Sequence, residues 1–116
     1  MESRVSIVQL RKDDFYLPIL RLLDSLGGSA SIEEMEQRLV EEFAFTDADL
    51  AVAHEKSGTP IIPNKIAWSR SYLKEAGLLA NERRGIWVLT ELGRNALAGG
   101  TEVIRECVAS AMRDYS

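Results

Sequence analysis

The stretch PNKIAWSRSYLKEAGLLANERRGIWVLT, residues 63–90, decides the fold of this 116-residue chain. Its first half predicts a helix over about residues 64–76. Gly77 follows directly, and glycine readily takes the left-handed conformation that closes a helix. Two short apolar runs come next, at residues 78–80 and 86–89. The sequence therefore predicts a helix followed at once by two strands.

The residues between the two apolar runs predict a hairpin turn with a basic tip. Residues 81–85 read NERRG, and asparagine and glycine are typical of hairpin turns. Arg83 and Arg84 are expected at the tip. A helix beside a charged hairpin is the layout of a winged helix-turn-helix, which is mainly α-helical with a small β-hairpin and belongs to the α+β class.

The residues before this stretch predict two further helices. Apolar side chains at helical spacing indicate a first helix that begins within residues 14–17 and ends at the glycines 27–28. Ser31 and Glu34 have the spacing of a capping box. A second helix should therefore begin there and run to about Phe43.

Shorter elements are expected around these helices. Residues 29–30 lie where a winged helix often has a small strand that pairs with the hairpin, and residues 5–10 could form a strand or an arm. Thr46 can cap a short helix that ends at about Ala53. Residues 54–63, HEKSGTPIIP, contain a glycine and two prolines, and this composition predicts a loop.

Two helices are predicted after the hairpin. Thr90 can cap the first, over about residues 91–98, and Thr101 can cap the second, over about residues 101–115. One side of the last helix is apolar and consists of Val103, Ile104, Cys107, Val108, Ala111 and Met112. This stripe either packs across the first helix or pairs with the same helix of a second chain.

The length and composition predict a single small domain. A chain of 116 residues can bury about two-thirds of its unfolded surface in one core. We expect one winged-helix domain over residues 1–116, with a core at about 14–98 and a C-terminal helix at about 101–115.

The composition also disfavours several classes of protein. One cysteine, Cys107, and one histidine, His54, cannot form an internal disulfide or supply a structural zinc site without acidic ligands or a second chain. We therefore expect no metal and no cofactor. No apolar run reaches the roughly 18 residues of a membrane span, and the N-terminus lacks the pattern of a secretory signal. A cytoplasmic location without a membrane partner is expected.

The charges are distributed unevenly along the chain. The net charge is −4, yet residues 1–55 hold five basic against twelve acidic side chains, and residues 56–94 hold seven basic against three acidic ones. Such an asymmetry is typical of a protein in which one face meets a polyanion. The basic part coincides with the predicted helix and hairpin.

The predicted helix of residues 64–76 has one side for the core and one for a partner. On the partner side and the flanks it carries the residue types that reach base edges and phosphates in helix-turn-helix proteins. These candidates for DNA contact are Asn64, Lys65, Trp68, Arg70, Ser71 and Lys74. Arg83 and Arg84 fit the minor groove or the backbone beside it. Trp68 also forms an i, i+4 pair with Tyr72, which would serve equally for packing.

Four motifs carry a family resemblance over about residues 14–98. They are LPIL at 17–20, NKIAW at 64–68, YLKEAGLL at 72–79, and RGIWVLT at 84–90 followed by Gly93. Together they resemble the N-terminal winged-helix domain of Mrr-type restriction endonucleases. The resemblance implies a DNA-recognition module of a restriction system that delivers a separate nuclease domain to modified DNA.

The resemblance implies DNA binding and not cleavage. The nuclease of that family forms a further C-terminal domain, and only 18 residues follow Ala98 here. Its core needs an acidic residue two positions before a lysine, so that a metal and a base share one site, and no lysine of this chain has one. We expect a protein that is not an enzyme and has no catalytic residues. Its expected partners are double-stranded DNA, plain or modified, and a separate nuclease subunit.

A second hypothesis is a protein-interaction or dimerisation module on the same scaffold, since a fold does not determine a function. The acidic first half and the apolar stripe favour it, and a homodimer would then form through residues 101–115. An enzyme is the third hypothesis. It is disfavoured because the acidic residues form no recognisable pair with a base, a nucleophile or a metal ligand.

Overall fold

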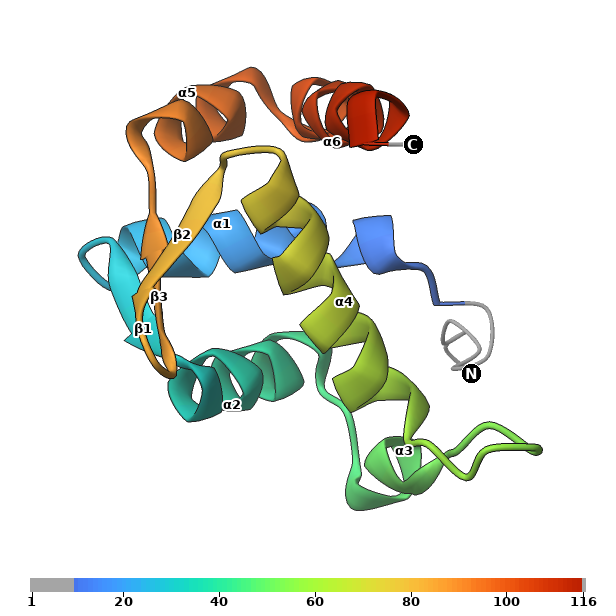
Figure 1. The fold of residues 1–116 in the computed structure, drawn as a ribbon. Coiled ribbons are helices and arrows are strands. Elements are labelled where there is room, and N and C mark those ends of the chain that lie inside the picture. Colours follow the sequence, from blue (N-terminus) through green and yellow to red (C-terminus); the bar gives the residue numbers. More distant parts are fainter. Residues whose placement is uncertain (1–9, 116) are drawn as a thin grey trace.

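The computed structural model describes residues 10–115, so most of the predicted arm at residues 5–10 lies outside the described part. The elements, labelled in Figure 1, are η2 (Lys12–Asp14), α1 (Tyr16–Ser25), β1 (Ser29–Ser31), α2 (Ile32–Phe43), α3 (Asp47–Ala51), α4 (Ile61–Glu75), β2 (Leu79–Arg83), β3 (Ile86–Leu89), α5 (Glu91–Gly99) and α6 (Thr101–Tyr115). The predicted fold class is confirmed: the chain is mainly helical with a small antiparallel sheet, in a winged-helix-like arrangement.

The sheet has the strand order β1-β3-β2, and both pairings are antiparallel. The predicted small strand is confirmed, because Ala30 of β1 lies opposite Trp87 of β3. The amide of Leu89 also donates to the Gly28 carbonyl at 2.8 Å. These bonds attach the hairpin to the connection between α1 and α2.

The core surrounds α1, which runs through the middle of the molecule in Figure 1. Its residues Ile19, Leu20 and Leu23 are fully buried, and α2 adds the buried Met35 and Leu39. Three aromatic rings, those of Phe15, Phe43 and Phe45, pack at one end with centroids 5.1–6.5 Å apart. The apolar stripes of α1 and α2 are thus buried against each other, as their helical spacing predicted.

Three helices begin where their caps were predicted. The Ser31 hydroxyl accepts from the Glu34 amide at 3.1 Å, and the Thr46 hydroxyl accepts from the Asp49 amide at 3.1 Å. Thr90 accepts from the amide of Gly93 at 2.9 Å. Local hydrogen bonds of this kind depend on residues three apart in the chain, so the sequence alone can predict them.

The predicted end of α3 and start of α4 were wrong. The short helix α3 ends at Ala51 rather than at about Ala53, and α4 begins at Ile61, within the predicted loop of residues 54–63. Ile61 and its neighbour Ile62 are buried, and burial of these two side chains draws the first turn onto the core. Pro63 is tolerated there because amides in the first turn of a helix have no partner within it.

The hairpin turn is tighter than residues 81–85. Strand β2 continues to Arg83, which lies opposite Ile86, so only Arg84 and Gly85 form the turn. Gly85 has a φ of 78°, a left-handed conformation that glycine adopts without strain. The register shifts between Ala80 and Arg83, which marks an irregularity in β2.

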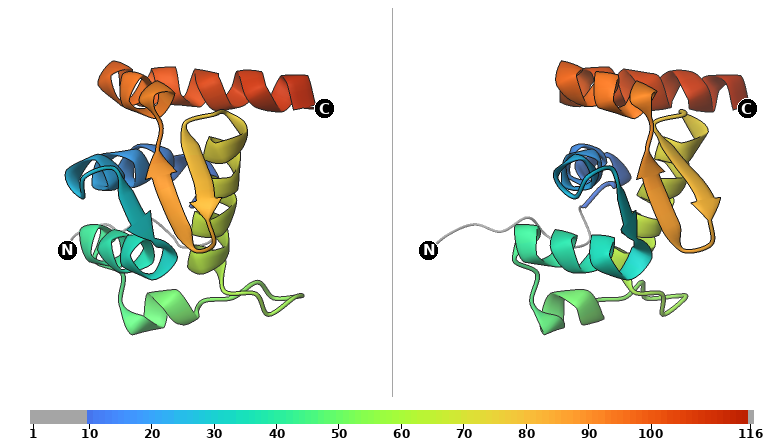
Figure 2. Two further views of the ribbon diagram at one scale, coloured as in Figure 1. Left: turned by 60° about the vertical axis from the view of Figure 1, so that its left-hand side comes forward. Right: turned by 90° about the vertical axis from the view of Figure 1, so that its left-hand side faces the viewer.

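The last helix packs on its own chain. Figure 2 shows α5 and α6 lying across the end of α4 and over α1. Ile104 and Val108 of α6 are buried there, at 0% and 4% exposure. The first of the two alternatives for the apolar stripe is therefore the one that the structure adopts.

Candidate nucleic-acid interface

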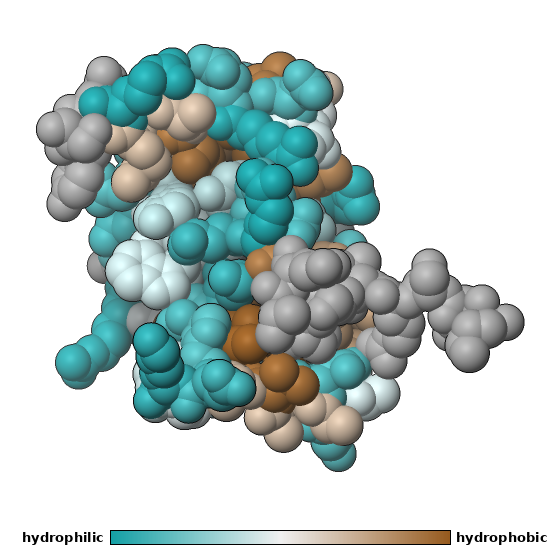
Figure 3. Space-filling model, turned by 90° about the vertical axis from the view of Figure 1, so that its right-hand side faces the viewer, coloured by the Kyte–Doolittle hydropathy of each residue, from teal (hydrophilic) through white to brown (hydrophobic). Residues whose placement is uncertain are grey.

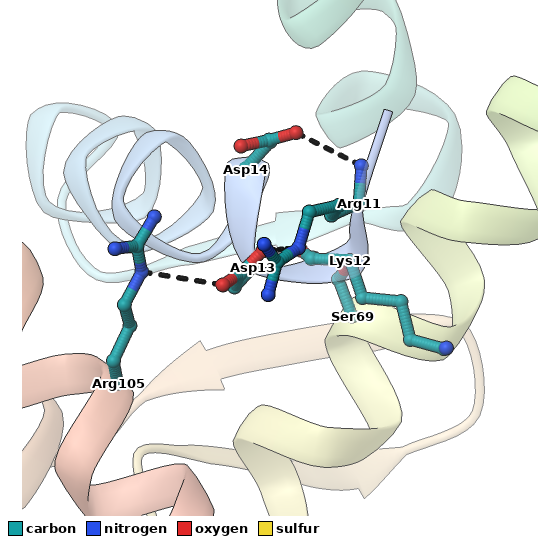
Figure 4. Close-up of polar contacts among 6 residues, drawn as sticks. All are labelled: Arg11, Lys12, Asp13, Asp14, Ser69 and Arg105. Carbon is teal, nitrogen blue, oxygen red and sulfur yellow. Dashed lines mark hydrogen bonds and ion pairs between the residues drawn. The ribbon is translucent and has the colours of Figure 1, made fainter. Parts of the chain in front are cut away.

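Helix α4 is fixed to the core along one side. Ile66 and Leu73 are buried, and the Ser69 hydroxyl lies 2.8 Å from the Lys12 carbonyl and 2.7 Å from that of Lys65. Figure 4 shows Ser69 next to the segment that contains Lys12. Because η2 and the core hold α4 from one side, its opposite side faces outward in a fixed orientation.

The outward side carries five of the six candidates predicted on this helix. Trp68, Ser71 and Lys74 are exposed, with 49% of the Trp68 surface accessible, and Asn64 and Lys65 are half-buried. The Ser71 hydroxyl donates to the Ala67 carbonyl of the preceding turn at 3.3 Å. These five residues, which we call the α4 face, lie on the accessible side and flanks of α4, and Lys65 lies on the flank that borders Tyr72.

The hairpin tip lies at the end of the same layer and carries two exposed arginines, Arg83 and Arg84. The amide of Ile32 donates to the Gly85 carbonyl at 3.0 Å. This bond ties the tip to the start of α2. The tip that carries the two arginines is thus held beside the start of α2 (Figure 1).

The basic groups of this surface are not neutralised by the protein. Lys65, Lys74, Arg83 and Arg84 form no ion pair with the side chains that the structure describes, a set that does not include Glu82. Elsewhere, by contrast, Arg105 is paired with an acidic side chain at 3.3 Å. An unpaired cation can exchange its counterion for a phosphate without first breaking a bond within the protein.

The sixth predicted residue of this helix, Arg70, lies inside the molecule. Only 9% of its side chain is exposed, and its guanidinium lies 5.5 Å from the centroid of the Trp87 ring. It is on the flank of α4 that the hairpin covers. Arg70 is therefore not part of the α4 face, although the helical projection placed it at the edge of that face.

The guanidinium nitrogens of Arg70 have few polar partners. Its Nη1 atom lies 3.8 Å from a Glu36 carboxylate oxygen, which is too long for a hydrogen bond. Nε and Nη1 are both buried without a hydrogen-bond partner in the described residues, and so is the indole nitrogen of Trp87. Burial lowers the pKa of Arg70 below its ordinary value, and the charge of Glu36 partly opposes this effect.

A second basic group beside α4 was missed by the sequence analysis. The Lys12 ammonium lies 5.4 Å from the centroid of the Tyr72 ring. Next to it, Asp13 forms ion pairs with Arg11 at 3.4 Å and with Arg105 at 3.3 Å (Figure 4). These residues come from η2, α4 and α6. No local signal could have found them, because only the packing of three distant segments brings them together.

No group of three or more histidine, cysteine, aspartate or glutamate side chains within residues 10–115 is placed to hold a metal ion. Among the described helices, none has the length and apolar character needed to cross a bilayer.

Comparison with known proteins gives two matches to this chain. The family model described as the Mrr N-terminal domain matches residues 13–99. The type IV methyl-directed restriction enzyme EcoKMrr of Escherichia coli (strain K12) is 28% identical over 94 residues, which cover 81% of this chain. The same alignment covers 31% of that enzyme, so the chain spans about a third of the length of this relative. No solved structure matches the chain.

Proposed function

Because this chain belongs to the Mrr N-terminal domain family, we propose that it is a non-catalytic DNA-recognition module of a restriction system. It binds duplex DNA with the α4 face in the major groove and with Arg83 and Arg84 on the adjacent backbone or minor groove. Cleavage would be supplied by nuclease residues that lie outside the region matched here. The module itself selects and holds the DNA.

The observation that carries this proposal is a set of four accessible cations, on α4 and at the hairpin tip of an acidic protein, that form no ion pair with the described side chains. Lys65, Lys74, Arg83 and Arg84 keep their charges exposed or half-exposed, while the chain as a whole has a net charge of −4. An acidic protein gains nothing for its own folding from a concentrated positive surface. Such a surface attracts a polyanion, and phosphate contacts supply most of the non-specific affinity for DNA.

Salt-dependent binding of a labelled duplex tests the proposal. Fluorescence anisotropy at increasing salt gives the slope of log K against log salt. In the variant Lys74→Ala, Arg83→Ala, Arg84→Ala, this slope should become shallower by about 0.9 for each phosphate that the protein no longer binds. Lys65 is left unchanged because it also lines a separate hollow beside α4.

A matched control removes three positive charges elsewhere. Arg21, Arg38 and Lys56 are exposed and lie outside α4 and the hairpin. Their replacement by alanine changes the net charge by the same amount and should leave most of the slope intact. The proposal fails if the wild type does not bind duplex DNA even at low salt, or if both variants lose the slope equally.

Recognition of modified DNA is the finer part of this proposal. The relative is described as methyl-directed, and the α4 face presents Trp68 and Ala67 as apolar groups that can contact a methyl group in the major groove. The same titration with plain and methylated duplexes of one sequence separates this preference from general affinity. Equal binding of the two would restrict the function to binding DNA without regard to methylation.

Homodimerisation through α6 is a second candidate function. The buried part of its stripe supports the fold of one chain, but Val103 of α6 and Leu92 of α5 remain 42% and 52% exposed. Light scattering of the wild type and of Val103→Glu tests it, since a dimer formed through this side of α6 should dissociate in the variant. A wild-type protein that is monomeric at all concentrations would contradict this candidate.

A further inference from the structure

A hollow of about 460 Å³ lies beside the α4 face, on the flank of α4 away from the hairpin. It is bounded by η2, by α4 through Lys65 and Tyr72, and by the side of α6 that carries Arg105, Val108 and Met112. Its volume falls within the range of pockets that hold small organic ligands. Figure 3 shows this side of the molecule, with a hydrophobic area near the top, where α6 lies, bordered by hydrophilic residues.

The interior of the hollow is apolar and aromatic. Leu10, Tyr16 and Val108 form part of its lining and are each less than a tenth exposed. The half-buried ring of Tyr72 forms a wall, and on the α4 face it contacts the exposed Trp68 ring, with centroids 6.0 Å apart. The aromatic surface therefore continues from the outward side of α4 into the hollow.

The polar groups of the hollow are mainly cationic. Arg11, Lys12, Lys65 and Arg105 line it, against the single carboxylate of Asp13. Asp13 is compensated by Arg11 and Arg105, which leaves an excess of positive charge. An apolar hollow lined by several cations suits a ligand that has both a flat apolar part and an anionic part.

Two polar groups of the lining are buried in the protein. The Oδ1 atom of Asp13 is inaccessible to solvent and lies 3.4 Å from Arg11 Nε. Burial, with the nearby charge of Asp13, raises the pKa of Tyr16 to about 12. The Tyr16 hydroxyl therefore stays protonated at neutral pH and adds no negative charge to the hollow.

We propose that this hollow binds one unpaired nucleotide, with its base against the Tyr72 ring and its phosphate near Lys12, Lys65 and Arg105. Stacking on aromatic rings and ionic contact with the backbone are the two interactions by which proteins hold unpaired nucleotides. The phosphate offers the Lys12 ammonium a stronger partner than the Tyr72 ring, since an exposed cation–π contact contributes little.

The nucleotide can come from two sources. It is either a free mononucleotide or an unpaired position in a DNA strand held on the α4 face, and in the second case the inference rests on the DNA binding proposed above. The chemistry recognised is the same in both. Two separate measurements distinguish the sources, and neither depends on the other.

The first measurement uses free ligands and the full chain labelled with ¹⁵N. Titration with deoxyadenosine monophosphate should shift the amide signals of Tyr72 and Arg105 in a saturable way, and inorganic phosphate should bind more weakly because it lacks the base. The variant Lys12→Gln should lose at least about fivefold in affinity for the nucleotide, the factor that corresponds to ~1 kcal/mol. Lys12 forms no ion pair in the described part of the chain, so this variant should keep the wild-type melting temperature.

The second measurement compares two short duplexes that differ by one unpaired nucleotide. The duplex with the unpaired nucleotide should bind about five- to a hundredfold more tightly, as expected for one stacked base. Lys12→Gln with Arg105→Gln should remove this preference and keep the affinity for the fully paired duplex. The control is Arg38→Gln, which lies in a different hollow between α1 and α2.

The results separate this inference from the proposed function. Saturable binding of the mononucleotide at the hollow supports the site even if duplex DNA does not bind. If the mononucleotide binds but the duplex with an unpaired nucleotide is not preferred over the paired one, the ligand is a free nucleotide. Normal duplex binding, with no nucleotide shifts at the hollow and no preference for the unpaired position, overturns the site alone. Equal affinity for phosphate and for the mononucleotide overturns the assignment of the base to the Tyr72 ring.

Discussion

Replacing Arg70 by methionine should stabilise the fold and leave DNA affinity unchanged. Methionine keeps an unbranched side chain of similar reach against the Trp87 ring, and it removes a guanidinium that is only 9% exposed. The substitution therefore tests whether Arg70 is a buried residue or a DNA contact. Its neighbour Lys74 lies in the next turn of α4 and is exposed, so Lys74→Met serves as the matched control.

The magnitude follows from the surroundings of Arg70. Two buried nitrogens without hydrogen-bond partners each cost about 1–3 kcal/mol, and methionine removes both costs. The substitution also removes an ion pair to the partly exposed Glu36, which contributes about 0–1 kcal/mol, and a cation–π interaction with Trp87 of about 0.5–2 kcal/mol. The free energy of unfolding should rise by about 2 kcal/mol, which corresponds to roughly 8 °C in melting temperature.

Two assays decide the result. Urea unfolding followed by circular dichroism gives the change in stability, and anisotropy with a labelled duplex gives the change in affinity. Arg70→Met should be the more stable protein and bind as the wild type does, whereas Lys74→Met should gain no stability and bind less tightly. A loss of affinity in Arg70→Met equal to that of Lys74→Met, or a loss of stability above about 1 kcal/mol, would refute the reasoning.

Two further predictions concern packing and pH. Gly93→Ala should lower the free energy of unfolding by about 1–3 kcal/mol, because a Cβ there would collide with the Leu78 carbonyl. Thermal melts measure the effect. The control, Asn95→Ala on the exposed side of the same helix, should leave the melting temperature nearly unchanged. The pKa of Tyr16 is about 12 in the folded protein against 10.0 ordinarily. The folded state therefore holds this proton more tightly, and stability should fall by up to about 3 kcal/mol as the pH rises from 10 towards 12. Tyr16→Phe should lack this loss in unfolding titrations at pH 9 and 11, and an unchanged loss would contradict the assignment.

The local signals in the sequence predicted the fold well. The caps at Ser31, Thr46 and Thr90 act between residues three apart, and the apolar stripes repeat every three or four residues, so neither depends on distant segments. The hairpin was predicted from the sequence NERRG between two apolar runs, and its position was correct. Its exact turn was wrong because the length of β2 is set by pairing with β3 and not by the turn residues.

The candidate surface could be predicted only in part. A helical projection gives the angle of each side chain around α4, and it correctly placed Ser71 and Lys74 outward and Leu73 inward. It cannot say whether a flank is covered. Arg70 and Lys65 were both placed on flanks, yet the hairpin buries the first, and the second borders an open hollow.

The sequence by itself determined the number and order of the helices, the strand that joins the hairpin, and the concentration of positive charge in residues 56–94. These features arise from short-range hydrogen bonds, from periodic apolar residues and from composition. Only the tertiary structure decided that Arg70 is buried, that α6 packs on its own chain, and that Lys12, Tyr72 and Arg105 share one hollow. The reason is physical: burial and the meeting of charges depend on which surfaces exclude water from each other, and that is settled only when distant segments pack together.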